Sequence, residues 1–585
     1  MRLEDYWGIG PKTSELLAEE LGVERAIRAI ESGDVRTLVD AGVPRGRTTR
    51  ILRRAHGGAG MDALATADAR SVYDDLLSLA AGYAVTGGAA DRIRVLTPLT
   101  DRATAADRLE EVLAAREAWE SLDGAARERV LEAFVAYDEA GGTDRAAVET
   151  ALALREVGLE GGTFDVLAEM DPTALREAAG ALGYLAETDD GIEVLEGADE
   201  ELDRTRDRLD AAGQLEAAAL DVMESVRAAG TRDTEEFRGA VVEHVAAETG
   251  IDRGTVRSAT AEGAVDTADF VSGTLRNLVD DLETRVGERE ETVAAALRSE
   301  VGDAEGDVER AVETVTDVAF ELSLGRFAAE HDLRRPDLVA DGLAVQGARN
   351  LFLSGDVQPV TYAVGPHDLP GTGSVRPPAD DRVAVLTGAN SGGKTTLLET
   401  LCAVAILASM GLPVPAEEAR VGSFDRVVFH RRHASFNAGV LESTLRSVVP
   451  PLVEGDRTLM LVDEFEAITE PGRAADLLNG LVGLTVDREA LGVYVTHLAA
   501  DLAPLPAAAR IDGIFAEGLT PELELEVDYQ PRFGTVGRST PEFIVSRLVA
   551  NAEDRTVRQG FEELASAVGQ EAVQRTLSDA RWVPE

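Results

Sequence analysis

The sequence predicts a multidomain fold, with a small α-helical module first, a mostly α-helical core with long lever helices next, and an α/β domain last. Three observations predict it. The chain has 585 residues, far more than one hydrophobic core usually organises. Apolar residues recur at helical spacings of three and four from about residue 61 to 330. Strand-length apolar runs then alternate with helical patterns after residue 336, which is typical of a parallel α/β sheet.

The chain is strongly acidic, with 107 acidic residues, 57 basic residues and a net charge of −50. Only Lys12 and Lys394 are lysines, and every other basic residue is arginine. We therefore expect a halophilic protein whose charge is mostly solvated surface. The single cysteine, Cys402, predicts neither a disulfide framework nor a cysteine metal site. Without a signal sequence or a membrane-length apolar run, we expect a cytoplasmic location.

Residues 1–60 read as a separate helical module. A glycine turn from Gly8 to Lys12 precedes a predicted helix over 14–21, and a weaker copy of this pattern begins at Gly42. This repeated order of a helix, a tight glycine turn and a second helix resembles the helix-hairpin-helix module of DNA-binding proteins. The resemblance implies contact between backbone N–H groups and DNA phosphates, without sequence preference.

The charge of the module agrees with this interpretation. Residues 41–60 hold five arginines and no acid, which is a local electrostatic footprint for nucleic acid. The alternative is an ordinary helical hairpin with a basic face. The candidate DNA-binding residues are Gly8, Gly10, Lys12, Arg45, Arg47, Arg50, Arg53 and Arg54.

Residues 61–335 are predicted to form the helical core with lever or clamp-like arms. Asp189-Asp190-Gly191 between short apolar runs indicates a β-hairpin, and helices are expected over 200–229 and 235–248. The apolar pattern from 266 to about 330 is longer than a globular helix and predicts a lever or a coiled-coil arm. Gly287, Gly302 and Gly306 predict bends in it.

The α/β domain is predicted over 336–550, followed by a C-terminal helical tail over 551–585. Its first strands are expected at 343–345, 350–353 and 360–364. The strand Val383–Leu386 then leads into a stretch that fits G-x-x-x-x-G-K-[ST], and a helix follows. This order predicts a Walker A phosphate loop, with Lys394 on the β- and γ-phosphates; the alternative is a chance glycine-rich turn. The candidate nucleotide-binding residues are Gly388, Ala389, Asn390, Ser391, Gly392, Gly393, Lys394, Thr395 and Thr396.

Two further strands end in residues suited to ATP hydrolysis. The run Thr458–Val462 is followed by Asp463 and Glu464, and the run 492–496 is followed by His497. We expect Thr395 and Asp463 to hold Mg²⁺, and Glu464 to activate the attacking water. His497 is placed to sense or polarise the γ-phosphate, although a histidine at a strand end can equally be structural.

Residues 330–550 resemble the ATPase domain of the MutS family. The similarity rests on Gly388–Thr396, on Met410–Gly422 and on a signature stretch at 435–444. In that family the signature reaches the nucleotide of a partner subunit, so the resemblance implies roles in trans for Ser443 and Thr444, and a homodimer. Thr469-Glu470-Pro471 is similar to the second, non-mismatch-repair MutS branch in an archaeal form.

The resemblance implies a Mg²⁺-dependent ATPase that binds duplex or branched DNA without sequence preference. We expect neither a mismatch-reading domain nor a nuclease domain, because the Phe-x-Glu pattern is missing and few residues follow Asn551. The alternative is a structural clamp ATPase of the chromosome-maintenance type with little turnover. In that class a coiled coil separates Walker A from Walker B, whereas here both follow the helical arms.

Overall fold

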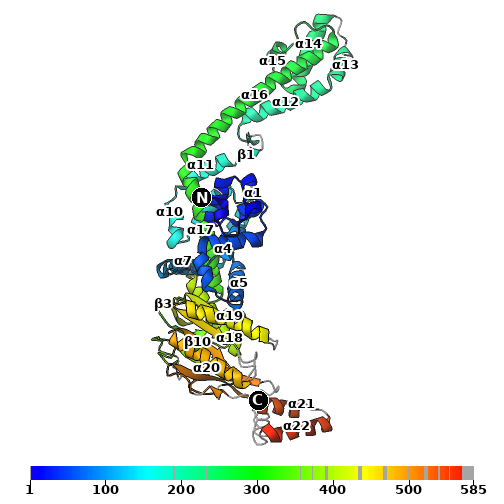
Figure 1. Ribbon diagram of the computed structural model, residues 1–585. Coiled ribbons are helices and arrows are strands. Elements are labelled where there is room, and N and C mark those ends of the chain that lie inside the picture. The colour runs from blue at the N-terminus through cyan, green and yellow to red at the C-terminus, as the bar shows by residue number, and fades with distance from the viewer. Residues whose placement is uncertain are drawn as a thin grey trace. The chain divides into compact units, whose positions relative to one another are not determined.

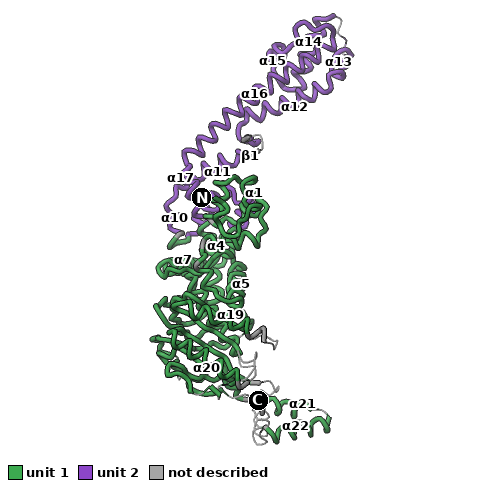
Figure 2. Tube along the Cα trace, in the orientation of Figure 1, with its two compact units in different colours: residues 1–131, 159–163, 316–585 green, residues 132–158, 164–315 purple. Residues whose placement is uncertain are grey.

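The computed structural model is mostly helical with mixed sheets. It divides into two compact units, one of residues 1–131, 159–163 and 316–585 and one of residues 132–158 and 164–315 (Figure 2). No helix in the described ranges is long and apolar enough to cross a membrane. The structure describes residues 2–188, 191–228, 230, 233–355, 357–371, 373, 375–388, 393–431, 438–464, 471–498, 501–502, 504–519, 525–537, 541–552, 554–568 and 573.

The first unit begins with a series of helices, several of which start at side-chain caps. Asp34, Thr66, Thr86 and Asp101 each accept a hydrogen bond from a backbone N–H in the first turn of the following helix. These elements are η1 (Leu3–Asp5), α1 (Pro11–Glu20), α2 (Val23–Ser32), α3 (Val35–Asp40), α4 (Arg45–Ala63), α5 (Ala67–Ala81), α6 (Gly87–Arg94) and α7 (Arg102–Ser121).

A six-stranded sheet organises the rest of this unit (Figure 1). Its order is β12-β11-β6-β10-β9-β8, and all neighbours are parallel except β11 and β12. A mixed four-stranded sheet has the order β3-β7-β4-β5. The strands are β3 (Asp337–Val339), β4 (Leu343–Ala348), β5 (Val360–Val364), β6 (Val383–Gly388), β7 (Glu418–Gly422), β8 (Arg426–His430), β9 (Thr458–Val462), β10 (Leu491–Val495), β11 (Ala509–Leu519) and β12 (Leu525–Phe533).

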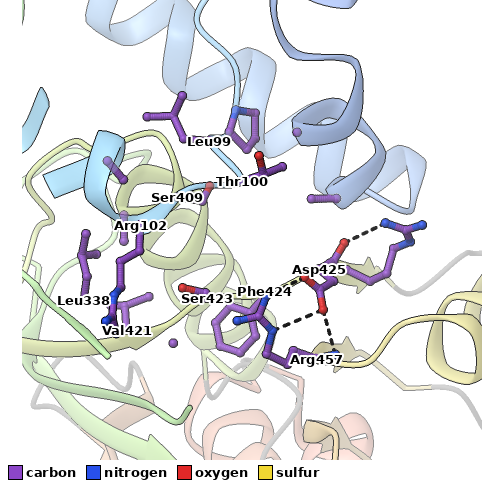
Figure 3. A pocket seen from close by; sticks show the side chains of 17 residues that line it. Leu99, Thr100, Arg102, Leu338, Ser409, Val421, Ser423, Phe424, Asp425 and Arg457 are labelled. Atoms are coloured by element: carbon purple, nitrogen blue, oxygen red, sulfur yellow. Dashed lines mark hydrogen bonds and ion pairs between the residues drawn. The ribbon is translucent and has the colours of Figure 1, made fainter. Parts of the chain in front are cut away.

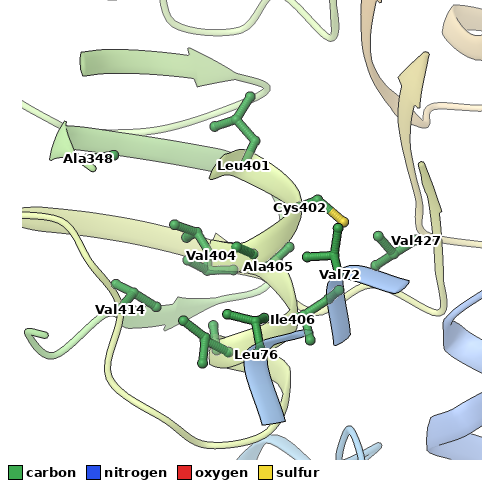
Figure 4. Close-up of a cluster of buried hydrophobic side chains, with 14 of the residues drawn as sticks. Val72, Leu76, Ala348, Leu401, Cys402, Val404, Ala405, Ile406, Val414 and Val427 are labelled. Atoms are coloured by element: carbon green, nitrogen blue, oxygen red, sulfur yellow. The ribbon is translucent and has the colours of Figure 1, made fainter. Parts of the chain in front are cut away.

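Helix α18 (Lys394–Ser409) lies at the centre of the largest hydrophobic core. Val72 and Leu76 of α5 lie beside Cys402 and Ile406 of α18 (Figure 4), so an early helix completes the core of the C-terminal sheet. Burial raises the pKa of the Cys402 thiol well above its ordinary value. The other helices of the C-terminal part are α19 (Ala438–Glu454), α20 (Pro471–Asp487), α21 (Pro541–Asn551) and α22 (Arg555–Val568).

The second unit is a helical bundle with one small hairpin. Its main core joins α12, α13, α14, α15 and α16 around buried residues such as Val241, Val271 and Leu275. Helices α8 (Gly124–Glu139) and α17 (Glu305–Glu330) contribute residues to both units, as does η2 (Gly162–Phe164). Its own elements are α9 (Asp144–Val157), α10 (Asp165–Glu169), α11 (Pro172–Leu182), β1 (Leu185–Thr188), β2 (Gly191–Val194), α12 (Glu200–Ala217), α13 (Ala219–Ala228), α14 (Thr234–Thr249), α15 (Arg253–Ser258) and α16 (Thr267–Asp303).

The hairpin prediction is confirmed in its strands, because β1 and β2 pair antiparallel with Thr188 opposite Gly191. Residues 189 and 190 of the predicted turn lie outside the described residues. The long helical pattern from 266 to 330 is not continuous. It breaks at Ala304, between Gly302 and Gly306, whereas Gly287 lies inside the continuous helix α16. The helix expected over 200–229 breaks at Ala218.

The strand predicted at 350–353 is wrong. Asn350 Oδ1 accepts a hydrogen bond from the Phe352 N–H at 2.8 Å, which closes a side-chain turn in place of a strand. The Asn350 amide also donates to Thr400 Oγ1 at 3.2 Å, and the residue is buried. The apolar residues 351–353 favoured a strand prediction, but Asn350 begins a turn, as asparagine often does.

Candidate functional site

The phosphate-loop residues follow β6, at the carboxyl end of the parallel sheet. Gly388 ends the strand with φ of 132°, and a Cβ there would lie 2.3 Å from the carbonyl oxygen of Ile514. Gly393 has φ of 70° and precedes α18, so both positions favour glycine for conformational and steric reasons. Ala389, Asn390, Ser391 and Gly392 lie outside the described residues.

Lys394 is the first residue of α18 and is only 4% exposed. Its Nζ donates to the carbonyl oxygen of Gly388 at 2.9 Å, so the ammonium group lies across the ends of the loop. A buried lysine at a helix N-terminus is suited to bind a polyanion, because the helix dipole adds to its charge. Thr396, two residues on, is partly buried in the first turn of the same helix.

Thr395 and Asp463 meet although they lie far apart in the chain. Thr395 Oγ1 donates to Asp463 Oδ2 at 2.6 Å, and Asp463 is 2% exposed at the end of β9. The backbone N–H of Asp463 donates to the carbonyl oxygen of His430 at 2.9 Å, which fixes this residue against β8. A hydroxyl and a carboxylate are hard oxygen donors of the kind Mg²⁺ prefers, so the pair fits that ion.

Glu464 and His497 are also brought together. Glu464 has φ of 41°, an uncommon conformation for a residue other than glycine, and its N–H donates to the carbonyl oxygen of Val495 at 3.1 Å. His497 Nε2 lies 2.8 Å from Glu464 Oε1. The strained backbone turns the Glu464 carboxylate toward the histidine that follows β10, and such strain often accompanies a functional site.

Part of this group of residues borders a cavity of about 530 Å³. Lys394, Thr395 and Glu464 line one part of it, while Asn350 and Tyr529 line another. A volume of this size accommodates a small-molecule ligand. The sequence analysis missed Asn350 and Tyr529 as lining residues, because neither belongs to a motif. Asn350 was assigned to a predicted strand, and Tyr529 lies on β12, which pairs antiparallel with β11.

A second, smaller cavity lies in the same unit and has different lining residues. It has a volume of about 120 Å³ and is bordered by Arg102, Ser409 and the ion-paired Asp425 and Arg457 (Figure 3). Arg457 holds the pKa of the Asp425 carboxyl below its ordinary value through hydrogen bonds and charge. None of the predicted site residues borders this cavity, so it is separate from the cavity beside Lys394.

The signature residues lie on α19. Ser443 is exposed, whereas Thr444 is 3% exposed and its Oγ1 lies 3.5 Å from Nε2 of the buried His430. Residues 432–437 lie outside the described residues, and the signature prediction falls partly on them. The structure therefore gives Ser443 an accessible surface and gives Thr444 an internal contact.

The two N-terminal glycine turns lie against each other's following helices: the turn at Gly8 packs on α4, and the turn at Gly42 packs on α1. Gly8 has φ of 84° and a Cβ there would lie 3.2 Å from Ile51 of α4, while Gly42 has φ of 90° and faces Leu16 of α1 at 3.7 Å. Gly10 caps α1, and Lys12 is exposed in its first turn. The two turns and the helices after them form one interlocked module.

The five arginines of α4 are not equivalent. Arg45 pairs with Asp91 at 2.6 Å, and Arg53 and Arg54 pair with Asp74 and Asp62, both at 2.7 Å. In the described part of the chain, the hydrogen bonds of the other two side chains go to backbone carbonyls, from Arg47 to Gly8 and from Arg50 to Gly46. The acid-free sequence over 41–60 therefore overstated the positive charge, because acids elsewhere in the chain neutralise three arginines.

Comparison with known proteins gives a match to MutS domain V over residues 384–450. The DNA-binding protein MutS2 of Pyrococcus furiosus is 41% identical over 240 residues, which cover 40% of this chain and 41% of that protein. The endonuclease MutS2 of Thermus thermophilus is 32% identical over 30% of this chain and 24% of its own length. The DNA mismatch repair protein MutS of Natronomonas pharaonis is 31% identical over 31% of this chain and 21% of its own length.

The chain thus covers less than half of each of these relatives. The domain match includes most of β6 and all of α18, and the first residues of α18 border the cavity of about 530 Å³. The domain match and the named relatives show that the C-terminal part of this chain is similar to MutS and MutS2 proteins.

Proposed function

We propose that this chain is a DNA-binding ATPase that hydrolyses ATP with Mg²⁺ and binds duplex or branched DNA without sequence preference. One observation carries the proposal. Lys394, the Thr395–Asp463 pair and the Glu464–His497 pair converge at the carboxyl ends of parallel strands, where α/β sheets bind their ligands. The MutS2 relative named as a DNA-binding protein supports the DNA-binding part.

Each residue has a distinct role in this proposal. Lys394 and the backbone of the phosphate loop hold the β- and γ-phosphates, and His497 orients the γ-phosphate end of the site. Glu464 accepts a proton from the attacking water as the bond between the γ-phosphorus and the bridging oxygen breaks, releasing ADP and phosphate. Thr395 and Asp463 would hold Mg²⁺, which neutralises phosphate charge when bound.

We assign DNA binding to residues 1–60, the helical core to 61–335, the ATPase to 336–550 and a helical tail to 551–585. Lys12, Arg47 and Arg50 are the side chains of the N-terminal module best suited to phosphates, because they are exposed and have no carboxylate partner in the described part of the chain. Gly8 and Gly10 contribute backbone contacts, while Arg45, Arg53 and Arg54 contribute less because of their acidic partners.

The active unit in this proposal is a homodimer. Ser443 is exposed on α19, as a residue that completes a partner's nucleotide site must be. Closed dimers are the commonest assembly of soluble proteins and place the same surface on both subunits. Specific activity should therefore fall when the protein is diluted below its dimer dissociation constant, and a constant rate from a proven monomer would exclude the homodimer.

The test of the proposed function is phosphate release from ATP at high salt, with and without duplex, mismatched or four-way DNA. We expect Mg²⁺-dependent release by the wild-type chain and none by Lys394→Ala, since the variant lacks the ammonium group that holds the phosphates. Equal release by both proteins would overturn the assignment of this site. Tight nucleotide binding with negligible turnover would instead favour a structural clamp.

A further inference from the structure

A short segment joins the N-terminal helices to the sheet that carries the nucleotide site. Helix α4 ends at Ala63, and residues 64–68 run along the outer edge of β8, the last strand of the six-stranded sheet. The Ala65 N–H donates to the carbonyl oxygen of Val427 at 3.1 Å. Thr66 Oγ1 donates to the carbonyl oxygen of Phe429 at 2.6 Å and accepts from the Phe429 N–H at 3.1 Å.

Asp68 completes this attachment. Its Oδ2 accepts a hydrogen bond from the Arg431 N–H at 2.8 Å, so alternate residues along β8 and just beyond it are bound to the segment. The same oxygen lies 3.9 Å from Nδ1 of the buried His430, whose other ring nitrogen lies 3.5 Å from Thr444 Oγ1. Asp68 therefore holds the strand end that leads into the signature stretch.

A second set of contacts runs from this strand end to the nucleotide cavity. The Arg431 guanidinium is ion-paired with Glu399 on α18, and Glu399 Oε2 accepts a hydrogen bond from the Asn350 amide at 3.1 Å. Asn350 borders the cavity with Lys394. The carbonyl of His430 also accepts the Asp463 N–H, so the same strand end contacts the candidate Mg²⁺ ligand.

We propose that residues 64–68 transmit DNA engagement of the N-terminal module to the nucleotide site, with Asp68 as the positioning residue. The inference rests on the proposed function, since it needs both DNA binding and ATP hydrolysis. Helix α4 carries Arg47 and Arg50, kinks at the non-helical Gly57 and ends directly before the segment. A displacement of α4 by DNA therefore reaches β8 through helical residues on both sides of one kink, with no loop between α4 and the segment. Closely packed networks shift between discrete arrangements and do not deform gradually, which suits them to this coupling.

The experiment compares the wild-type chain with Asp68→Ala, which removes the acceptor of the Arg431 N–H, and Asp68→Asn, which keeps a carbonyl oxygen there. The matched control is Asp75→Ala, an exposed acid on the same helix. For each protein we would measure the turnover number with and without saturating duplex DNA, and the Kd for DNA with and without a non-hydrolysable ATP analogue. Thermal unfolding would verify that each variant is folded.

We expect DNA to change wild-type turnover by at least about fivefold, at the lower end of ordinary coupling. In Asp68→Ala this response should fall below about twofold, while basal turnover and the DNA Kd without nucleotide stay within about twofold of wild type. The effect of the analogue on DNA affinity should also fall, because in this inference the same segment links the two binding sites. Asp68→Asn should retain most of the response, and Asp75→Ala all of it.

A wild-type response in Asp68→Ala would overturn the inference, and so would a folded Asp68→Ala that has lost basal turnover. A wild-type chain that hydrolyses ATP and binds DNA without any response to DNA would also overturn it, while leaving the proposed function intact. A wild-type chain that lacks hydrolysis or DNA binding would instead refute the proposed function.

A double-mutant cycle tests the route through α18. If Asp68 and Glu399 act along one path, Asp68→Ala combined with Glu399→Gln should reduce the DNA response no further than Asp68→Ala alone. Independent, multiplicative losses would exclude the Arg431–Glu399 contact as part of the path.

Discussion

The unequal pairing of the α4 arginines predicts unequal roles in DNA binding. Each arginine that contacts a phosphate contributes about 0.9 to the slope of log K against log salt concentration. Arg47 and Arg50 have no carboxylate partner among the described residues, so replacing both by glutamine should flatten the slope by about 1.8. Arg53 is 15% exposed and paired with Asp74, so Arg53→Gln should leave the slope nearly unchanged.

The assay is the anisotropy of a labelled duplex, titrated with each protein at a series of salt concentrations. When the salt concentration is raised threefold, the Kd of the wild-type chain should rise about sevenfold more than the Kd of the double variant, which follows from a slope difference of about 1.8. A difference of this size is readily measured. The loss should be the same for unrelated sequences, because phosphate contacts carry no sequence information. If Arg53→Gln flattens the slope as much as the double variant does, the argument from carboxylate pairing is wrong.

Three other predictions follow from the geometry. Glu464→Gln should still bind ATP but hydrolyse it very slowly, and normal steady-state phosphate release would remove this residue from its proposed role. Gly60→Ala should lower the free energy of unfolding by about 1–3 kcal/mol, because its Cβ would lie 1.8 Å from the carbonyl oxygen of Pro98. Thermal melts should show no such loss for the neighbouring Gly58→Ala, whose Cβ meets nothing within 4 Å. Asp199→Asn should destabilise the second unit at pH 6 but hardly at pH 2, as an acid titration followed by circular dichroism would show. Hydrogen bonding to Arg289 lowers the pKa of Asp199 in the folded state from 3.8 to about 2. The stability that the ionised carboxylate contributes is therefore lost as the pH falls from about 4 to about 2.

Short-range patterns predicted the local elements of the α/β region well. The strand at 383–386, the helix after it and the strands before Asp463 and His497 all have their own apolar signature, and the structure has β6, α18, β9 and β10 there. It also brings Thr395 beside Asp463 and Glu464 beside His497, as expected where parallel strands end at one edge of a sheet.

Contacts between distant parts of the chain could not be predicted in this way. Residues 64–66 add to the edge of β8, but no periodicity in 61–70 shows that its partner is at 427–429. The acids that neutralise Arg45, Arg53 and Arg54 lie outside residues 41–60. Long-range pairing depends on the three-dimensional arrangement of the chain. Local charge therefore overstated the positive charge of residues 41–60, and local pattern gave no sign that residues 64–66 pair with β8.

The attachment of residues 64–66 to β8 also has a consequence for solubility. An uncovered outer strand exposes unpaired N–H and C=O groups, which are a template for pairing with another chain. Here the segment occupies that edge through the backbone of Val427 and Phe429. A truncation that begins at residue 61 keeps this cover, whereas one that begins at residue 70 would uncover the strand and should aggregate. The position of a cut within ten residues therefore decides whether the C-terminal part can be handled in isolation.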